Sequence, residues 1–166
     1  MAARSVSLNG LDGLVRIDNG DIKEVSCNYK KASFDIVTSN PPYIKGSHGL
    51  ENPDAPKNIA RHEVHVTLEQ VVAAAEHAIK PGGSFYMIHK PFRLAEIFEC
   101  LHEHRLEPKR MQLVHPYIDK EPNMVIVEAV KGGNSMIKID PPMIVYKAPG
   151  VYTEQLLATY EGTAKR

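Results

Sequence analysis

The segment that decides the fold reads Phe34-Asp-Ile-Val-Thr-Ser-Asn-Pro-Pro-Tyr-Ile44. Its first six residues form an apolar-rich run that predicts a buried strand over 34–39. Pro41 and Pro42 have no N–H to donate, so strand pairing must end there. A loop rich in Gly, Pro, Asn and Asp follows from Lys45 to Asn58, and long loops in compact domains are often functional. The segment therefore predicts a strand whose carboxyl end opens into a functional loop.

Further strands and helices are expected to alternate around this segment. Apolar residues at helical spacing predict helices over 67–79 and 91–104, with Thr67 as an N-cap and Pro91 as a favourable start. The inner side of the second helix should carry Phe92, Leu94, Ile97, Phe98 and Leu101. Strands are expected over 84–89, 110–115 and 124–130, and the near-continuous apolar run of the last one favours a central position.

The two ends of the chain carry shorter expected elements. A short strand is expected over 14–17, with Leu11, Val15 and Ile17 on its core side. Short extended pieces at 136–139 and 143–146 should precede a last helix over 152–160. Strands alternating with helices predict an α/β fold with a Rossmann-like, doubly wound, mostly parallel sheet.

Composition limits the possible functions. The chain has 166 residues, enough for one domain, and its 20 basic and 20 acidic residues give a net charge of zero. That balance excludes a strongly basic nucleic-acid-coating protein, although it leaves room for a local basic patch. No apolar run is long enough to span a bilayer. The two cysteines, Cys27 and Cys100, have no CxxC spacing, which favours free thiols and a reducing, cytoplasmic setting.

The tetrapeptide Asn40-Pro41-Pro42-Tyr43 has the chemistry of an amine-binding site. Ligands of open α/β sheets bind beyond the carboxyl ends of the strands, where this segment is expected. Asn40 and Pro41 offer carbonyl acceptors outside the strand ladder, and Tyr43 offers a flat face for stacking. Hydrogen bonds accepted from an NH₂ group raise the electron density on its nitrogen, which can then attack an electrophilic methyl group. The alternative interpretation is that residues 40–43 form an ordinary loop. The similar segment Asp140-Pro-Pro-Met143 lacks the aromatic residue and is expected to be a turn.

The segment 34–44 resembles motif IV of the class I S-adenosylmethionine-dependent amino-methyltransferases. These enzymes methylate adenine N6, guanine N2 or the glutamine side-chain nitrogen. The segments 60–63, 80–83 and 145–154 resemble the bacterial methyltransferases that modify N6 of adenosine 37 in valine tRNA. The resemblance covers nearly the whole chain, from Met1 to Tyr160.

The resemblance implies roles for individual residues. Asp21 would accept a hydrogen bond from the adenine amine of S-adenosylmethionine, and Ile22 would pack on the adenine ring. The alternative interpretation of Asp21 is a turn residue. The expected catalytic set is Asn40, Pro41, Pro42 and Tyr43, in which Asn40 and Pro41 hold the target amine and Tyr43 stacks on a flipped base. Asn40 also belongs to the expected cofactor set. Contacts with RNA phosphates are expected from Lys45, Arg61, His62, Lys90 and Arg93.

The chain departs from this family at its N-terminal end. The strand with a Gly-rich turn that cradles the methionine part of the cofactor is not found, and neither is the acidic strand end that binds the ribose. The chain instead opens within an expected helix that has no N-cap residue and that ends near Asn9 and Gly10. Residues 1–166 are therefore interpreted as part of one methyltransferase domain, a C-terminal fragment that by itself binds cofactor poorly and is inactive. The absent first strand would lie beside the strand that ends at Ser39.

Several functions remain open. The favoured one is methyl transfer from S-adenosylmethionine to adenine N6 in tRNA. The alternatives are a glutamine-N5 protein methyltransferase, a guanine-N2 RNA methyltransferase and a binding module without activity. No metal site is expected, because His62 and His65 lack further ligands at matching spacing.

Overall fold

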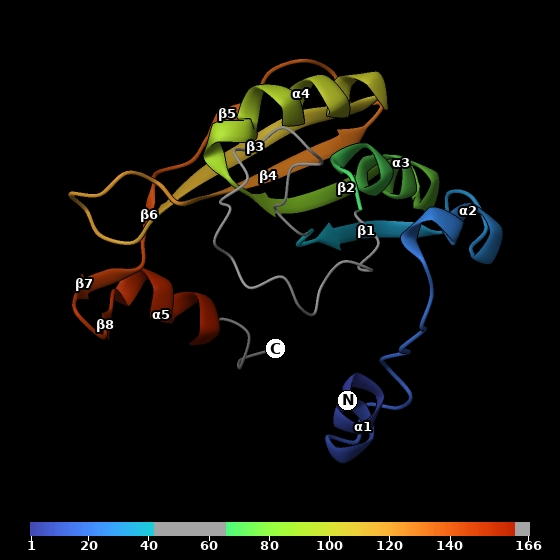
Figure 1. The fold of residues 1–166 in the computed structure, drawn as a ribbon, viewed down its shortest axis with the longest axis horizontal. Coiled ribbons are helices and arrows are strands. Elements are labelled where there is room, and N and C mark those ends of the chain that lie inside the picture. Colours follow the sequence, from blue (N-terminus) through green and yellow to red (C-terminus); the bar gives the residue numbers. More distant parts are fainter. Residues whose placement is uncertain (42–65, 162–166) are drawn as a thin grey trace, which may run out of the picture.

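The structure, a computed structural model, describes residues 1–41 and 66–161. Its core is a sheet in the order β1-β2-β4-β3-β5, with β6 also paired to β3 (Figure 1). The strands are β1 (Phe34–Ser39), β2 (Ile79–His89), β3 (Leu106–His115), β4 (Met124–Lys131), β5 (Lys138–Ile139) and β6 (Met143–Ile144). Only β4 is antiparallel to its neighbours, so five of these six strands run in one direction. The mostly parallel sheet and the central position of β4 are confirmed.

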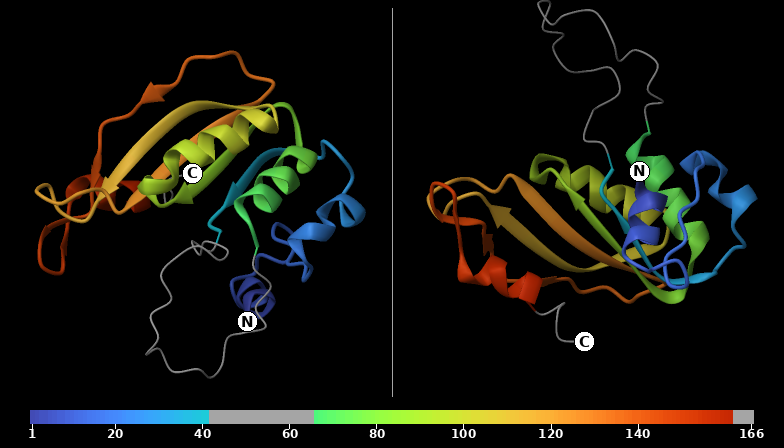
Figure 2. Two further views of the ribbon diagram at one scale, coloured as in Figure 1. Left: turned by 45° about the horizontal axis from the view of Figure 1, so that its top comes forward. Right: turned by 90° about the horizontal axis from the view of Figure 1, so that it is seen from below.

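Two helices pack side by side on one face of the sheet (Figure 2). They are α3 (Leu68–Ala78) and α4 (Leu94–Glu103), and α4 follows the 3₁₀ helix η2 (Pro91–Arg93). α3 begins where the sequence predicts, because Thr67 and Gln70 form a reciprocal capping box. The main core lies between these helices and alternate residues of β2 and β4, with Phe85, Met87, Val125 and Val127 almost fully buried.

Shorter elements occupy both ends of the chain. α1 (Ala2–Leu8) lies at the end of an extended segment away from the sheet, and it stops as expected before Gly10, whose φ of 66° suits glycine. The helices η1 (Ile22–Glu24) and α2 (Val25–Asn28) lead into β1. After the sheet come the hairpin strands β7 (Tyr146–Ala148) and β8 (Val151–Tyr152), and α5 (Glu154–Glu161). Within the described ranges, no helix has the length and apolar character needed to cross a membrane.

Three sequence expectations are wrong in the structure. Residues 14–17 form no strand, and Val15 and Ile17 are exposed, because no neighbouring strand of the described chain pairs with them. β1 forms as predicted but is not buried: Phe34 is 41% exposed and Ile36 is 60% exposed, since β1 pairs with β2 alone among the described strands. Phe92 is 74% exposed because it lies in η2, ahead of the amphipathic part of α4.

Candidate cofactor and amine site

Asn40 and Pro41 lie at the carboxyl end of β1. The strand ends at Ser39, Asn40 is exposed and Pro41 is buried. Because β1 and β2 are parallel, with Ser39 beside Met87, the ends of both strands lie at the same edge of the sheet (Figure 1). This is the edge at which open α/β sheets bind their ligands.

Asp21 and Ile22 approach the same edge from the start of η1. Asp21 is the N-cap of η1, and its Oδ1 accepts the backbone N–H of Lys23 at 2.9 Å. The remaining acceptor capacity of the carboxylate is available for a ligand, because a carboxylate has about four lone-pair sites. Ile22 is half-buried and packs against the main core. The short 3₁₀ helix thus presents a carboxylate and an apolar side chain next to each other.

These two pairs of residues line one open cavity of about 540 Å³. Gly20 and Ser39 complete the polar part of its wall, and Val66 and Val71 add apolar surface. A second cavity of about 270 Å³ shares Ile22, Ser39 and Val71 and extends between α2, β1 and α3. The first cavity therefore combines acceptors from two separate elements with apolar side chains, which suits a planar ligand that carries an amine.

His89, which the sequence analysis did not single out, ends β2 at this edge. Its side chain is 1% exposed, and its Nδ1 accepts the backbone N–H of Lys90 at 2.7 Å. Burial lowers the pKa of the His89 imidazole, and the positive charge of Arg93 lowers it further. The neutral ring is therefore favoured near pH 7. The sequence signal for this residue was its position: His89 ends a predicted strand, as Asn40 follows the end of another.

Two of the residues expected to contact RNA, Lys90 and Arg93, lie in the described ranges, and their surroundings differ. Lys90 is half-buried, and its Nζ donates to the main-chain oxygen of Asn123 at 3.3 Å. The Arg93 side chain is only 8% exposed and forms an ion pair with Glu96, to which its Nε donates at 2.8 Å. This pairing raises the pKa of Arg93. A phosphate contact by Arg93 is not supported, because its guanidinium is buried against Glu96.

The remaining expected site residues lie outside the described ranges. They are Pro42, Tyr43, Lys45, Arg61 and His62. The segment at Asp140, in contrast, is described and lies away from the cavity. Asp140 forms ion pairs with Arg110 at 2.7 Å and with Lys138 at 3.2 Å, which anchor β5 against β3. The expected turn is wrong: β5 and β6 both pair parallel to β3, so residues 140–142 form an extended link between them, not a reversal of the chain.

Comparison of the sequence with known proteins finds relatives that share one protein name. No family model matches the chain. It is 29% identical, over 150 residues, to a tRNA1(Val) (adenine(37)-N6)-methyltransferase of Porphyromonas gingivalis, a match that covers 87% of this chain and 58% of the relative. A protein of the same name from Parabacteroides distasonis is 30% identical over 96 residues, covering 57% of this chain and 39% of the relative. The match thus spans less than two thirds of the length of both curated relatives, 58% of the first and 39% of the second.

Solved structures with a similar fold are also methyltransferases. A predicted O-methyltransferase from Agrobacterium tumefaciens superposes with a TM-score of 0.72 at 20% identity, covering 97% of this chain and 71% of that one. A geranyl diphosphate C-methyltransferase from Streptomyces coelicolor, solved with S-adenosyl-L-homocysteine, gives a TM-score of 0.54 at 12% identity, covering 77% of this chain and 59% of that one. The fold is therefore that of the class I methyltransferases, as the resemblance implied.

Proposed function

We propose that the protein transfers a methyl group from S-adenosylmethionine to the exocyclic N6 amine of adenine in tRNA. The observation that carries the proposal is the shared cavity, because it joins Asp21 and Ile22 to Asn40 and Pro41. The sequence relatives add the substrate class, since they are named as tRNA adenine-N6 methyltransferases. A tRNA substrate also implies action in the cytoplasm. Because the match covers 58% of the first relative, the activity is a proposal for the whole protein, and we propose that residues 1–166 belong to one methyltransferase domain.

The described residues fit the adenosyl part of the cofactor. An adenine ring needs an acceptor for its exocyclic amine and an apolar surface for its face, and Asp21 and Ile22 supply these side by side. The volume of about 540 Å³ lies within the usual range of small-molecule pockets. When bound, S-adenosylmethionine supplies an electrophilic methyl group.

Asn40 and Pro41 would act on the target amine. The Asn40 side-chain oxygen and the main-chain carbonyl groups of this turn would accept hydrogen bonds from the amine and so orient its lone pair. They are most effective when fixed in advance, which the proline ring and the burial of Pro41 favour. With the cofactor bound, the nitrogen held at this site would gain its bond to the methyl carbon as the carbon–sulfur bond of the donor broke, and it would release one proton to solvent.

We propose adenine N6 and not another amine as the target because the sequence relatives are named as adenine-N6 methyltransferases. Carbonyl acceptors at Asn40 and Pro41 would hold a glutamine amide or a guanine amine equally well, so the cavity by itself fits all three. A glutamine-N5 protein methyltransferase and a guanine-N2 RNA methyltransferase remain the alternative enzymes, and a binding module without activity is the alternative outside enzymology. For the tRNA, we propose stacking by Tyr43 and phosphate contacts by Lys45, Arg61, His62 and Lys90.

The experiment that tests the proposal is deletion of the gene in its source organism, followed by mass spectrometry of its tRNA. The expected result is loss of N6-methyladenosine from valine tRNA, restored by the wild-type gene but not by Asn40→Ala. Asp140→Asn is the matched control and should restore the modification. Intact tRNA together with an unmethylated release-factor glutamine would establish the protein alternative. Intact tRNA and release factor would contradict both the adenine and the glutamine assignments, and loss of N2-methylguanosine from other RNA would then establish the guanine alternative.

A further inference from the structure

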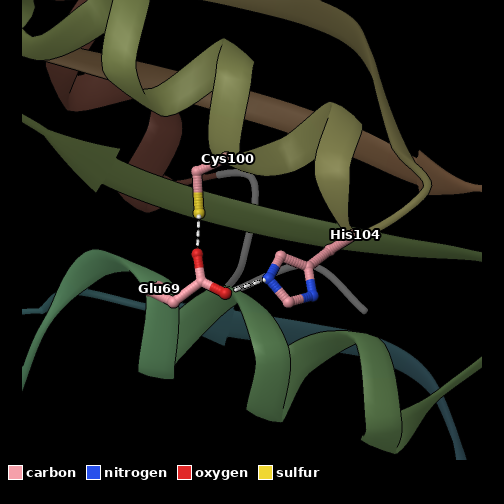
Figure 3. A group of neighbouring side chains, drawn as sticks. All are labelled: Glu69, Cys100 and His104. Atoms are coloured by element: carbon pink, nitrogen blue, oxygen red, sulfur yellow. Dashed lines mark hydrogen bonds and ion pairs between the residues drawn. The ribbon is translucent and has the colours of Figure 1, made fainter.

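A cluster of three metal-ligating side chains joins α3 to α4, separate from the cavity. The members are Glu69, Cys100 and His104 (Figure 3). The Cys100 thiol donates to Glu69 Oε2 at 3.3 Å, and His104 Nε2 lies 2.6 Å from Glu69 Oε1. The sulfur, the ring nitrogen and a carboxylate oxygen all lie within 4.8 Å of one another. The Glu69 carboxylate thus lies between the thiol and the imidazole.

The local sequence explains why these side chains converge. Cys100 and His104 are four residues apart, one within α4 and the other at its C-cap, and this spacing puts two side chains on one face of a helix. Glu69 lies in the first turn of α3, which packs against α4. The group is not evident from the sequence because Glu69 is 31 residues from Cys100 and 35 from His104. The Cys-x₃-His spacing on a predicted helix was the available signal.

We propose that Glu69, Cys100 and His104 bind a Zn²⁺ ion that links α3 to α4. A thiolate, an imidazole and a carboxylate form a mixed sulfur, nitrogen and oxygen set, which suits Zn²⁺ and not the oxygen-seeking Mg²⁺ or Ca²⁺. Tetrahedral Zn²⁺ with bonds of about 2.0–2.3 Å holds its ligand atoms roughly 3.3–3.6 Å apart. The 3.3 Å contact of the Cys100 sulfur and the 2.6 Å contact of His104 Nε2 go to different oxygens of Glu69, and one ligand atom from each residue lies within 4.8 Å of the others. Coordination by a single carboxylate oxygen therefore needs rotation of the Glu69 carboxylate and a shift of the side chains toward the ion.

The surroundings of the cluster leave room for a fourth ligand. The Glu69 side chain is 59% exposed and that of His104 is 21% exposed, whereas Cys100 is buried at 6%. The ion would thus be reached from the Glu69 side, where a water molecule can complete the tetrahedron. One thiolate and one carboxylate balance the charge of the ion, and the thiol proton passes to solvent on binding.

The proposed ion would stabilise the helix that walls the cavity. α3 contributes Val71 to that wall, just over half a turn beyond Glu69. Each link between α3 and α4 therefore helps to fix the apolar side of the cavity. The inference does not depend on methyl transfer, and it holds or fails whatever amine the protein modifies.

The test is titration of the full chain with Co²⁺, a spectroscopic substitute for Zn²⁺. One equivalent should produce a thiolate-to-cobalt charge-transfer band, and added Zn²⁺ should abolish the band. Cys100→Ser should remove the band entirely. Glu69→Gln and His104→Asn should each weaken binding by at least about 10-fold, the lower limit seen even for residues that only support a ligand. Zn²⁺ should also raise the Tm of the wild type and not that of Cys100→Ser.

Matched controls separate coordination from folding. Cys27→Ser removes the exposed cysteine outside the cluster, and His102→Asn removes a neighbouring histidine, so both should keep the band and the affinity. Cys100→Ser retains a hydroxyl that can donate to Glu69, so its metal-free circular dichroism spectrum should match the wild type. The absence of a band at one equivalent, or a band that depends on Cys27 instead of Cys100, would overturn the proposal.

Discussion

Asp21 and Asn40 line the same cavity although two short helices and a strand separate them in the chain. Asp21 is fixed by its N-cap bond to the backbone N–H of Lys23, and Asn40 by its place directly after β1. The two acceptors therefore come from independent elements. We expect that substitutions can separate cofactor binding from positioning of the target amine.

In the whole protein, Asn40→Ala should lower kcat for methyl transfer to tRNA by about 10²- to 10³-fold, the usual loss when one preorganised polar group is removed from a reacting centre. KM for tRNA should change much less, because many phosphate contacts hold the RNA. Initial rates with a radiolabelled methyl donor measure both quantities. Asp140→Asn, in the similar Asp-Pro-Pro segment, should keep both values. An Asn40→Ala enzyme with more than half of the wild-type kcat would contradict the proposed role.

Asp21→Ala should weaken binding of S-adenosylmethionine by roughly 10- to 100-fold, as expected for loss of a hydrogen bond to a charged group. The same change removes the N-cap of η1, so Asp21→Asn is the sharper variant, because its amide oxygen can still cap the helix. Calorimetric titration measures the affinity. Asp18→Asn, which alters a carboxylate paired with Arg16 outside the cavity, should leave the affinity unchanged. Equal affinities for Asp21→Ala and wild type would exclude Asp21 from the cofactor site.

Lys131→Met should destabilise the fold by about 1.5–3 kcal/mol, the range for hydrogen bonds to a charged group. Lys131 is 13% exposed, and its Nζ donates to the main-chain oxygens of Glu76 and Ile79 at 2.5 and 3.0 Å, at the C-terminal end of α3. A cation there also interacts favourably with the helix dipole. Urea unfolding at pH 7 measures the change. The exposed Lys147→Met should stay within about 0.5 kcal/mol of wild type.

The Glu76–Lys131 ion pair should add to acid sensitivity. Its Nζ–Oε1 distance is 2.8 Å, and the hydrogen bond from Lys131 holds the pKa of Glu76 below its usual value of 4.5. A carboxyl group with a lowered pKa stabilises the fold above pH 4.5, and this contribution is lost as the pH falls through the folded-state pKa. Glu76→Gln should therefore flatten the stability profile below pH 4.5, as measured by urea midpoints. An unchanged profile would show that the pair contributes nothing.

His89 should lower the stability of the fold at a higher pH than the Glu76–Lys131 pair does, beginning just below pH 6.5. Burial lowers its pKa from the usual 6.5, so the unfolded chain takes up a proton below that pH before the folded chain does. Stability should then fall as the pH drops below 6.5 towards the folded-state pKa. His89→Gln should reduce that slope, whereas His102→Gln, whose side chain is 56% exposed, should retain it. Thermal unfolding between pH 8 and pH 5.5 tests both.

Short sequence patterns correctly predicted the start of α3, the central strand β4 and the end of β1. Thr67 begins α3 through a capping box that spans four residues, and the apolar run of 124–130 marked β4 as central. The segment at Asn40 and Pro41 was likewise predicted at a strand end, and the structure places it there. Each of these depends on neighbours within a few residues.

Features that depend on partners elsewhere in the chain could not be predicted. Val15 and Ile17 have the apolar pattern of a strand, but a strand forms only beside another strand. Arg93 was expected to be an exposed cation. Its i,i+3 spacing from Glu96 on the predicted helix makes their ion pair predictable, but the sequence does not show that the guanidinium is buried beside His89. The contact between Glu69 and Cys100 depends on how α3 packs against α4, and no short sequence pattern predicts that packing.

The partly exposed edge of β1 has a consequence for how the chain behaves in solution. Its apolar residues Phe34 and Ile36 are accessible, and among the described strands only β2 pairs with it. Accessible strand edges of this kind recruit further strands, which makes concentrated solutions prone to oligomers and precipitates. The ion pair of Asp35 with Lys80 places two charges at this strand and should limit such growth. Solubility of the chain should therefore fall when salt screens that pair, and a partner strand in a longer polypeptide would protect the same edge.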